Sequence, residues 1–287
     1  LMGVHTNKCV LGRPFGIRQL VYQGKNVVLM RDMTDSLYSP KFPPHVSHVR
    51  GTEMVVEHIE KHWCPTITST EVLHRPAFRF SEDERPHVAI LVSDDHYHAD
   101  KTLPRYAQWL RENHGCYCTV HHGQGTAVFP NLAELRAADV LVLYIRRLAP
   151  PKDQLAAIKA YLREGNPLVA LRTASHAFAA HYSIPGKNVP PGHAEWREFD
   201  PEVLGGSYHG HAGNELGTDV AIVPERADHP LLSGVKPAEW HSAGSMYYTS
   251  PLVDDATTLM LGSADNETEP LTWYRTYRGG RVRSEEH

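Results

Sequence analysis

Cysteine is scarce in this chain of 287 residues, and long apolar stretches are absent. Four cysteines are too few to stabilise a chain of this length through disulfides, which favours a reducing, cytoplasmic environment. No apolar stretch approaches the roughly 20 residues that a membrane-spanning helix needs. Lysine and arginine form no run typical of nucleic-acid or membrane surfaces, and the formal net charge is -4. We therefore expect neither a nucleic-acid partner nor membrane association.

Glycine-rich nucleotide motifs are missing as well. No Gly-x-Gly-x-x-Gly follows an expected strand, so a nicotinamide cofactor is not indicated. Histidine, in contrast, occurs 20 times, which favours metal or acid–base chemistry. Hydrophobic residues (41%) and charged residues (22%) occur in ordinary globular proportions, which argues against disorder. The chain begins with Leu1 rather than methionine, so one interpretation is that it is a fragment.

The apolar pattern divides the chain into three parts. Residues 1–72 contain too few strands and helices to bury both faces of a parallel sheet, so we expect a partial α/β unit there. Residues 73–86 contain Pro76, Pro86 and an acidic cluster, and we interpret them as a linker. Residues 87–287 are the expected main domain.

Strands and helices alternate regularly from residue 87 onward. We expect strands at 87–92, 117–120, 140–145 and 167–171, and helices at 103–113, 132–138 and 152–164, with Asn131 as the N-cap of the second helix. This alternation is typical of α/β proteins with a parallel, doubly wound sheet. Ligands of such sheets bind at the carboxyl ends of the strands.

The most informative local feature is the segment 167–176 (PLVALRTASH), where an apolar strand breaks into a turn and then a helix. In α/β enzymes such a turn presents one side chain above the sheet, beside free backbone N–H groups. Here that position carries Arg172, flanked by Thr173 and Ser175. A guanidinium suits a carboxylate, a phosphate or sugar oxygens, but it cannot act as a nucleophile. The alternative is that Arg172 pairs with a structural carboxylate.

Other polar and aromatic side chains are candidates for the same edge of the sheet. Those that follow the first strand are Asp94, Asp95, His96 and His98, which could bind a sugar or a metal or form a solvated loop. His209 and His211 could share a metal ion if the backbone bends, or could be two polar loop histidines. His229, before Pro230, is expected to shape a turn near the pocket. Trp240 and Trp273 could stack on a sugar ring or pack in the core.

The turn at Arg172 resembles the pattern of ThuA-like (trehalose utilisation) proteins, in which an apolar strand precedes Gly-Ile-His-Ser-Ala-Ser. It is also similar to the strand-to-cysteine turn of class I glutamine amidotransferases, whose cysteine position Arg172 takes. Downstream segments that follow the ThuA-like order are 196–199, 204–206, His211, His229 with Pro230, 247–251, 270–273 and 279–282. The resemblance covers residues 87–282. It implies a flavodoxin-like, glutamine amidotransferase-like fold that is not a glutaminase.

The sequence departs from the ThuA-like pattern at two places. Gly244 and Ser245 stand where many relatives have an Asp-Glu pair, just before the tyrosine that matches Tyr247. After residue 282 the family usually continues with an aromatic strand and a Gly-His, whereas this chain ends in polar residues. We therefore expect a final strand and a potential site histidine to be missing or altered.

Residues 3–10 (GVHTNKCV) resemble the nucleophile segment of isochorismatase-like cysteine hydrolases. The resemblance implies that Cys9 is the nucleophile and that the backbone N–H groups of Lys8 and Cys9 form an oxyanion hole. The family's aspartate base and lysine come from an N-terminal half that does not precede residue 1 here. We therefore expect little or no amidase activity, and a half-domain left by fusion or truncation is the alternative.

These observations leave three functional hypotheses. The first is an enzyme of carbohydrate metabolism that binds or converts a trehalose-related sugar derivative, with Arg172 and His211 in catalytic roles. Its expected substrate-binding residues are Asp94, His96, His98, Thr173, Ser175, His209, His229, Tyr247 and Trp273. The second is a non-catalytic sugar-binding or interaction module, and the third is a cysteine hydrolase active only if the missing half is supplied. The sequence leaves open whether the protein binds a divalent metal and whether it forms a homo-oligomer.

Overall fold

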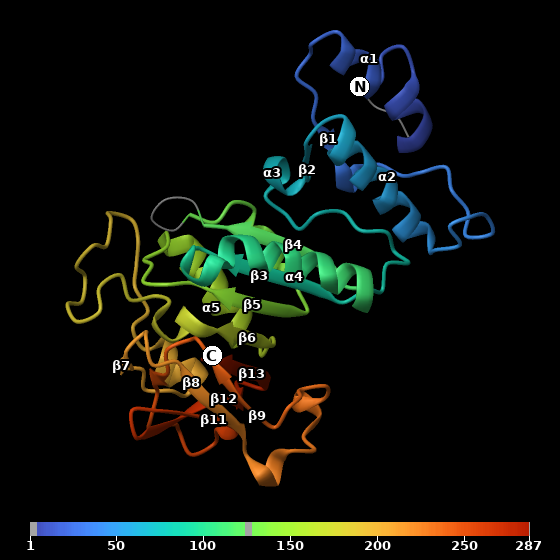
Figure 1. Ribbon diagram of the computed structural model, residues 1–287. Coiled ribbons are helices and arrows are strands. Elements are labelled where there is room, and N and C mark those ends of the chain that lie inside the picture. Colours follow the sequence, from blue (N-terminus) through green and yellow to red (C-terminus); the bar gives the residue numbers. More distant parts are fainter. Residues whose placement is uncertain (1–4, 124–127, 287) are drawn as a thin grey trace. The chain divides into compact units, whose positions relative to one another are not determined.

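The computed structural model describes residues 5–123 and 128–286 (Figure 1). The chain divides into two compact units, with the boundary between Arg85 and Pro86. We call the part up to Arg85 unit 1 and the part from Pro86 onward unit 2. Within the described ranges, no helix combines the length and the apolar character that crossing a bilayer requires.

Unit 1 is a small α/β unit built around one pair of parallel strands, β1 (Leu29–Met30) and β2 (Thr66–Ile67). Its helices are α1 (Ile17–Tyr22), α2 (His48–His62) and α3 (Thr70–Leu73), with helical turns η1 (Thr6–Val10) and η2 (Arg31–Met33). Ser47 is the N-cap of α2, and its hydroxyl accepts the Arg50 N–H. Its buried Val56 and Ile59 pack into the core of this unit.

The segment interpreted as a linker makes ion pairs within unit 1. Arg79 and Arg85 both pair with the nearly buried carboxylate of Asp83, at 3.2 and 2.6 Å. Arg85 also binds Glu53 of α2 at 2.8 Å. These contacts attach residues 79–85 to α2, and unit 2 starts directly after them.

Unit 2 contains a nine-stranded mixed sheet in the order β4-β3-β5-β6-β13-β12-β11-β8-β9. The parallel strands are β3 (His87–Val92), β4 (Tyr117–His122), β5 (Val140–Tyr144), β6 (Leu168–Leu171) and β13 (Gly280–Glu285). The antiparallel part is formed by β12 (Glu267–Tyr277), β11 (Thr257–Ala264), β8 (Thr218–Ile222) and β9 (Glu239–Ser242). The parallel part confirms the α/β prediction, whereas the antiparallel extension was not predicted.

Two long helices cover opposite faces of the parallel part (Figure 1). Successive side chains of a strand point to opposite faces of a sheet. In β3, Ala89 and Leu91 pack with α5 (Lys152–Arg163), while Val88 and Ile90 pack with α4 (Ala99–His114). All six residues of β3 are therefore buried, as expected for the interior of a doubly wound sheet.

Shorter elements complete unit 2. They are the turns η3 (His96–His98), η4 (Leu132–Ala137), η5 (Arg172–His176), η6 (Asp200–Leu204), η7 (Pro224–Arg226) and η8 (Pro230–Leu232), and the antiparallel pair β7 (Gly210–His211) and β10 (Tyr247–Tyr248). Asn131 occupies the predicted N-cap position, directly before η4. Its backbone is left-handed, with φ 59°, and its side chain makes no cap hydrogen bond.

The final strand, which we expected to be missing or altered, is present with polar residues. Strand β13 lies inside the sheet, parallel to β6 and antiparallel to β12. Its polar side chains are tolerated there because they find partners: Ser284 donates to the Glu286 carboxylate at 2.6 Å. Glu285 accepts from Thr272 of β12 at 2.7 Å. The sequence pattern did not predict this strand because its side chains are polar, and their hydrogen bonds appear only in the folded chain.

Candidate functional site

The chain leaves the sheet at a sharp corner directly after β6. Arg172 has a left-handed backbone, with φ 51°, and opens the fully buried turn η5. A non-glycine residue in this conformation costs roughly 1 kcal/mol and persists where its surroundings hold it. The backbone N–H of Arg147 donates to the His176 carbonyl at 3.1 Å, and that of Leu148 to the Ala177 carbonyl at 2.7 Å. The corner predicted after residue 171 is confirmed.

Neutral groups surround the Arg172 guanidinium. Its Nη1 donates to the backbone carbonyl of Glu286, and its Nη2 donates to the Tyr97 hydroxyl at 2.8 Å. It also lies over the rings of Tyr97 and Tyr247, at 4.7 and 4.2 Å from their centroids. No described carboxylate lies at ion-pair distance, so the alternative of a structural ion pair is not observed. Burial would raise the pKa of Tyr97, but the hydrogen bond and charge of Arg172 lower it below the ordinary value.

A cavity of about 580 Å³ lies beside this corner, within the range of small-molecule sites. It is bordered by η5, η6, β7, the segment 177–182 and the loop after β5. Of the predicted residues, Ser175, His209 and His211 line it, whereas Arg172 does not. Arg172 is 5% exposed, and its Nη1 and Nη2 donate to protein groups, so its contact with a ligand stays a prediction.

The three histidines of the cavity each use Nδ1 in a local hydrogen bond. His209 and His211 donate from Nδ1 to the carbonyls of Ser207 and Ala212, both at 2.8 Å, which leaves each Nε2 available. His176 lies 3.2 Å from the Ser175 hydroxyl and stacks on Tyr208 with ring centroids 4.5 Å apart. Burial, with the charges of Arg147 and Arg146, lowers the pKa of His176 to about 3, so its ring is neutral near pH 7.

Two buried carboxyl groups lie close to the corner. Asp200, at the start of η6, borders the cavity and accepts the Tyr208 N–H at 2.7 Å. Burial raises the pKa of Asp200 to about 7. Burial also raises the pKa of Glu286 to about 8, and the charge of Asp200 contributes to that rise. A carboxyl group that exchanges its proton near neutral pH is suited to general acid–base chemistry.

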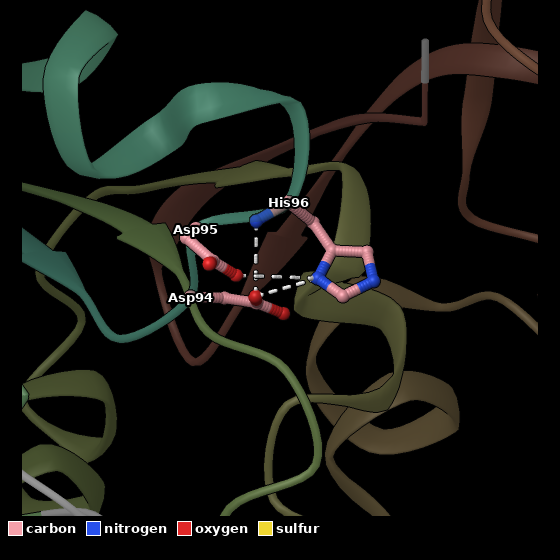
Figure 2. A group of neighbouring side chains, drawn as sticks. All are labelled: Asp94, Asp95 and His96. Atoms are coloured by element: carbon pink, nitrogen blue, oxygen red, sulfur yellow. Dashed lines mark hydrogen bonds and ion pairs between the residues drawn. The ribbon is translucent and has the colours of Figure 1, made fainter.

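The loop after β3 forms a separate polar group (Figure 2). Asp94, Asp95 and His96 place one ligand atom each within 4.8 Å of one another, the one such trio found in the described part of the chain. His96 Nδ1 lies 2.7 Å from Asp94 and 3.8 Å from Asp95. Carboxylate and imidazole ligands suit a divalent cation. Tyr97 of the same loop, which sequence reasoning missed, reaches Arg172.

The structure does not bring the remaining predicted residues into the cavity. His229 accepts the Leu231 N–H at 3.2 Å and packs on Tyr274. Trp273 is fully buried and donates to the Leu204 carbonyl at 2.8 Å, so it takes the core role that the sequence also allowed. The other predicted residues outside the lining are Thr173 and Tyr247, which are buried, and His98, which is exposed.

The metal site predicted at His209 and His211 lacks a third ligand among the residues that the structure describes. The cavity lining includes four polar residues that the sequence analysis did not name as candidates: Arg147, His176, Asp200 and Tyr208. His176 is the last residue of the segment 167–176, and Asp200 directly follows the segment 196–199, so both positions carried an available signal. Arg147 follows the predicted strand 140–145, and this position at the carboxyl end of a strand was a signal for a ligand-binding residue.

Cys9 lies in η1 of unit 1 and is partly exposed. Gly3 and Val4 of its motif lie outside the described residues. The Lys8 N–H donates to the His5 carbonyl at 3.1 Å, so one donor of the expected oxyanion hole is already in use. In the range from residue 5 to 123 no acid or histidine is hydrogen-bonded to the Cys9 thiol, so the geometry adds no support for a hydrolase site there.

Residues 88–283 match the family model described as ThuA, trehalose utilisation. The chain belongs to the ThuA family. Membership confirms the ThuA-like resemblance and supports a carbohydrate-related role. The family match begins at residue 88, so unit 1 lies outside it.

One solved structure supports this assignment of the fold, and a second is reported for comparison. A ThuA-like protein from Bacteroides uniformis ATCC 8492 is 15% identical, with a TM-score of 0.52 over 72% of this chain and 84% of that one. A ThuA-like protein from Parabacteroides merdae ATCC 43184 is 14% identical, with a TM-score of 0.46 over 70% of this chain and 79% of that one. At such identity the first likeness shows the fold alone. No protein with a curated description matches the chain.

Proposed function

We propose that unit 2 binds a sugar or sugar derivative in the cavity beside the corner at Arg172. The observation that carries this proposal is the position of the cavity at the carboxyl end of β6, where α/β sheets bind their ligands. Aromatic residues such as Tyr182 and Tyr208 border it together with polar groups. Ring faces can pack on the apolar C–H surface of a sugar, while hydroxyls and imidazoles bind its oxygens.

The proposed chemistry is proton transfer on the bound sugar by Asp200. Its carboxyl group borders the cavity and exchanges its proton near neutral pH, whereas His176 is neutral there. Hydrolysis or isomerisation of an oxidised sugar would both use such a group. This favours an enzyme over a module that only binds sugar.

Thermal shift with a panel of trehalose, other disaccharides and their oxidised derivatives tests binding. A ligand at a free concentration of about one hundred times its Kd stabilises the folded state by about 2.7 kcal/mol, which raises the Tm by several degrees. We expect the shift in wild type and in the control His229→Ala, which changes a histidine outside the cavity, and a smaller shift in His211→Ala. The absence of any shift across the panel would contradict the proposal.

NMR of the bound sugars tests conversion. We expect wild type to form a product, and Asp200→Asn to bind the same sugar without converting it. Product formation at an unchanged rate in Asp200→Asn would remove Asp200 from the mechanism, and binding without any product in wild type would favour the non-catalytic module.

A further inference from the structure

Arg147 is held in a strained backbone conformation at the border of the cavity. It follows β5, and its φ is 49°, in the left-handed region. Its own N–H and that of Leu148 are bonded to the carbonyls of His176 and Ala177 in and after η5. Such strain persists where the surrounding structure determines it, and it is frequent at ligand sites. The backbone thus fixes the place from which the Arg147 side chain borders the cavity.

The Arg147 guanidinium has no carboxylate partner in the part of the chain that the structure describes. Its Cζ lies over the ring of Tyr182, 5.9 Å from the ring centroid. The second arginine of the cavity differs: Arg197 pairs with Glu195 at 3.3 Å and donates to the carbonyl of His181. Burial and the charge of Arg146 lower the pKa of Arg147, so the protein around it disfavours its charge.

The cavity provides no fixed negative charge against Arg147. Its one bordering carboxyl group, Asp200, takes up a proton near pH 7, and His176 is neutral. A half-buried guanidinium without a counter-charge is stabilised when an anion binds it. Its planar fork of donors matches the two oxygens of a carboxylate or phosphate.

We infer that the ligand of this cavity is an anionic sugar, bound by Arg147 through a carboxylate or phosphate group. The sugar part of this inference rests on the proposed function, while the anionic part rests on the geometry of Arg147. A neutral sugar is then expected to bind more weakly than a charged sugar that has the same ring.

Isothermal titration of the full chain with glucose, glucuronate, glucose 6-phosphate and inorganic phosphate tests the inference. We expect one or both charged sugars to bind at least tenfold more tightly than glucose, and the stronger one identifies the anionic group. Arg147→Gln should lose this preference. The matched control Arg146→Gln removes a positive charge at the preceding position, which does not border the cavity. This control should retain the preference for charged sugars.

Arg147→Asn provides a second variant, because asparagine tolerates the left-handed backbone that Arg147 adopts. Circular dichroism confirms that each variant is folded. Equal or tighter binding of glucose, or a preference that survives in both Arg147 variants, overturns the inference but leaves the sugar function standing. Binding of inorganic phosphate through Arg147 without any sugar supports the anion site and overturns the sugar function. No binding of any probe overturns both.

Discussion

Replacing the buried Asp200 by asparagine should make the protein more stable, by an amount that grows with pH. Burial raises the pKa of Asp200 from 3.8 to about 7. The folded protein therefore holds a proton on Asp200 that the unfolded chain releases between pH 4 and 7. In that window the unfolded state binds fewer protons, so the free energy of unfolding falls as pH rises.

The size of the effect follows from the shift. Each pKa unit corresponds to about 1.4 kcal/mol, so ionised Asp200 costs roughly 4 kcal/mol above pH 7. Roughly 2.5 kcal/mol of this cost develops between pH 5 and pH 8. Asparagine keeps an oxygen that can accept the Tyr208 N–H but does not ionise. Glu286 is present in both proteins, and because the charge of Asp200 contributes to its raised pKa, the difference between variant and wild type includes this coupling as well.

Urea unfolding followed by circular dichroism and tryptophan fluorescence at pH 5, 6, 7 and 8 measures the difference. The control Asp254→Asn removes the same group from an exposed position. We expect the advantage of Asp200→Asn over wild type to increase by roughly 2.5 kcal/mol from pH 5 to pH 8. An advantage that is the same at both pH values would refute the idea that burial holds a proton on this carboxyl.

Two further predictions concern Arg172 and Cys9. Arg172→Met should lower the free energy of unfolding by about 3 kcal/mol or more, because the Glu286 carbonyl and the Tyr97 hydroxyl lose a charged donor. Urea unfolding measures this loss of stability, and a loss below about 1 kcal/mol would show that these two hydrogen bonds contribute little. Iodoacetamide at pH 7 should label Cys9 no faster than the partly exposed Cys116, since no described base contacts its thiol. Peptide mass spectrometry follows both sites, and rapid selective labelling of Cys9 would contradict this.

Local pattern accounts for the parts of the fold that could be predicted. Apolar runs such as residues 87–92 and 140–144 become buried parallel strands because a strand covered on both faces needs apolar side chains in succession. The corner after residue 171 was predictable because an apolar strand gives way there to small and polar residues. Strand β13 was not, since its side chains are polar and the hydrogen bonds that satisfy them, such as that from Thr272 to Glu285, form only on folding.

The candidate site was only partly predictable for the same reason. Ser175, His209 and His211 were identified from the resemblance and from their residue types. Arg147 and Asp200 were missed, because their significance comes from missing ion pairs and burial, which depend on segments far away in the sequence. The hydrogen bonds from Arg172 to Tyr97 and Glu286 were not predictable, because nothing in its own segment reveals these partners.

The sequence by itself determined the α/β alternation and the ThuA resemblance, because periodicity and short motifs are local properties of the chain. The tertiary structure alone decided which side chains border the cavity and in what protonation state. Those properties follow from contacts between residues that are distant in sequence, since desolvation and hydrogen bonding depend on everything packed around a group.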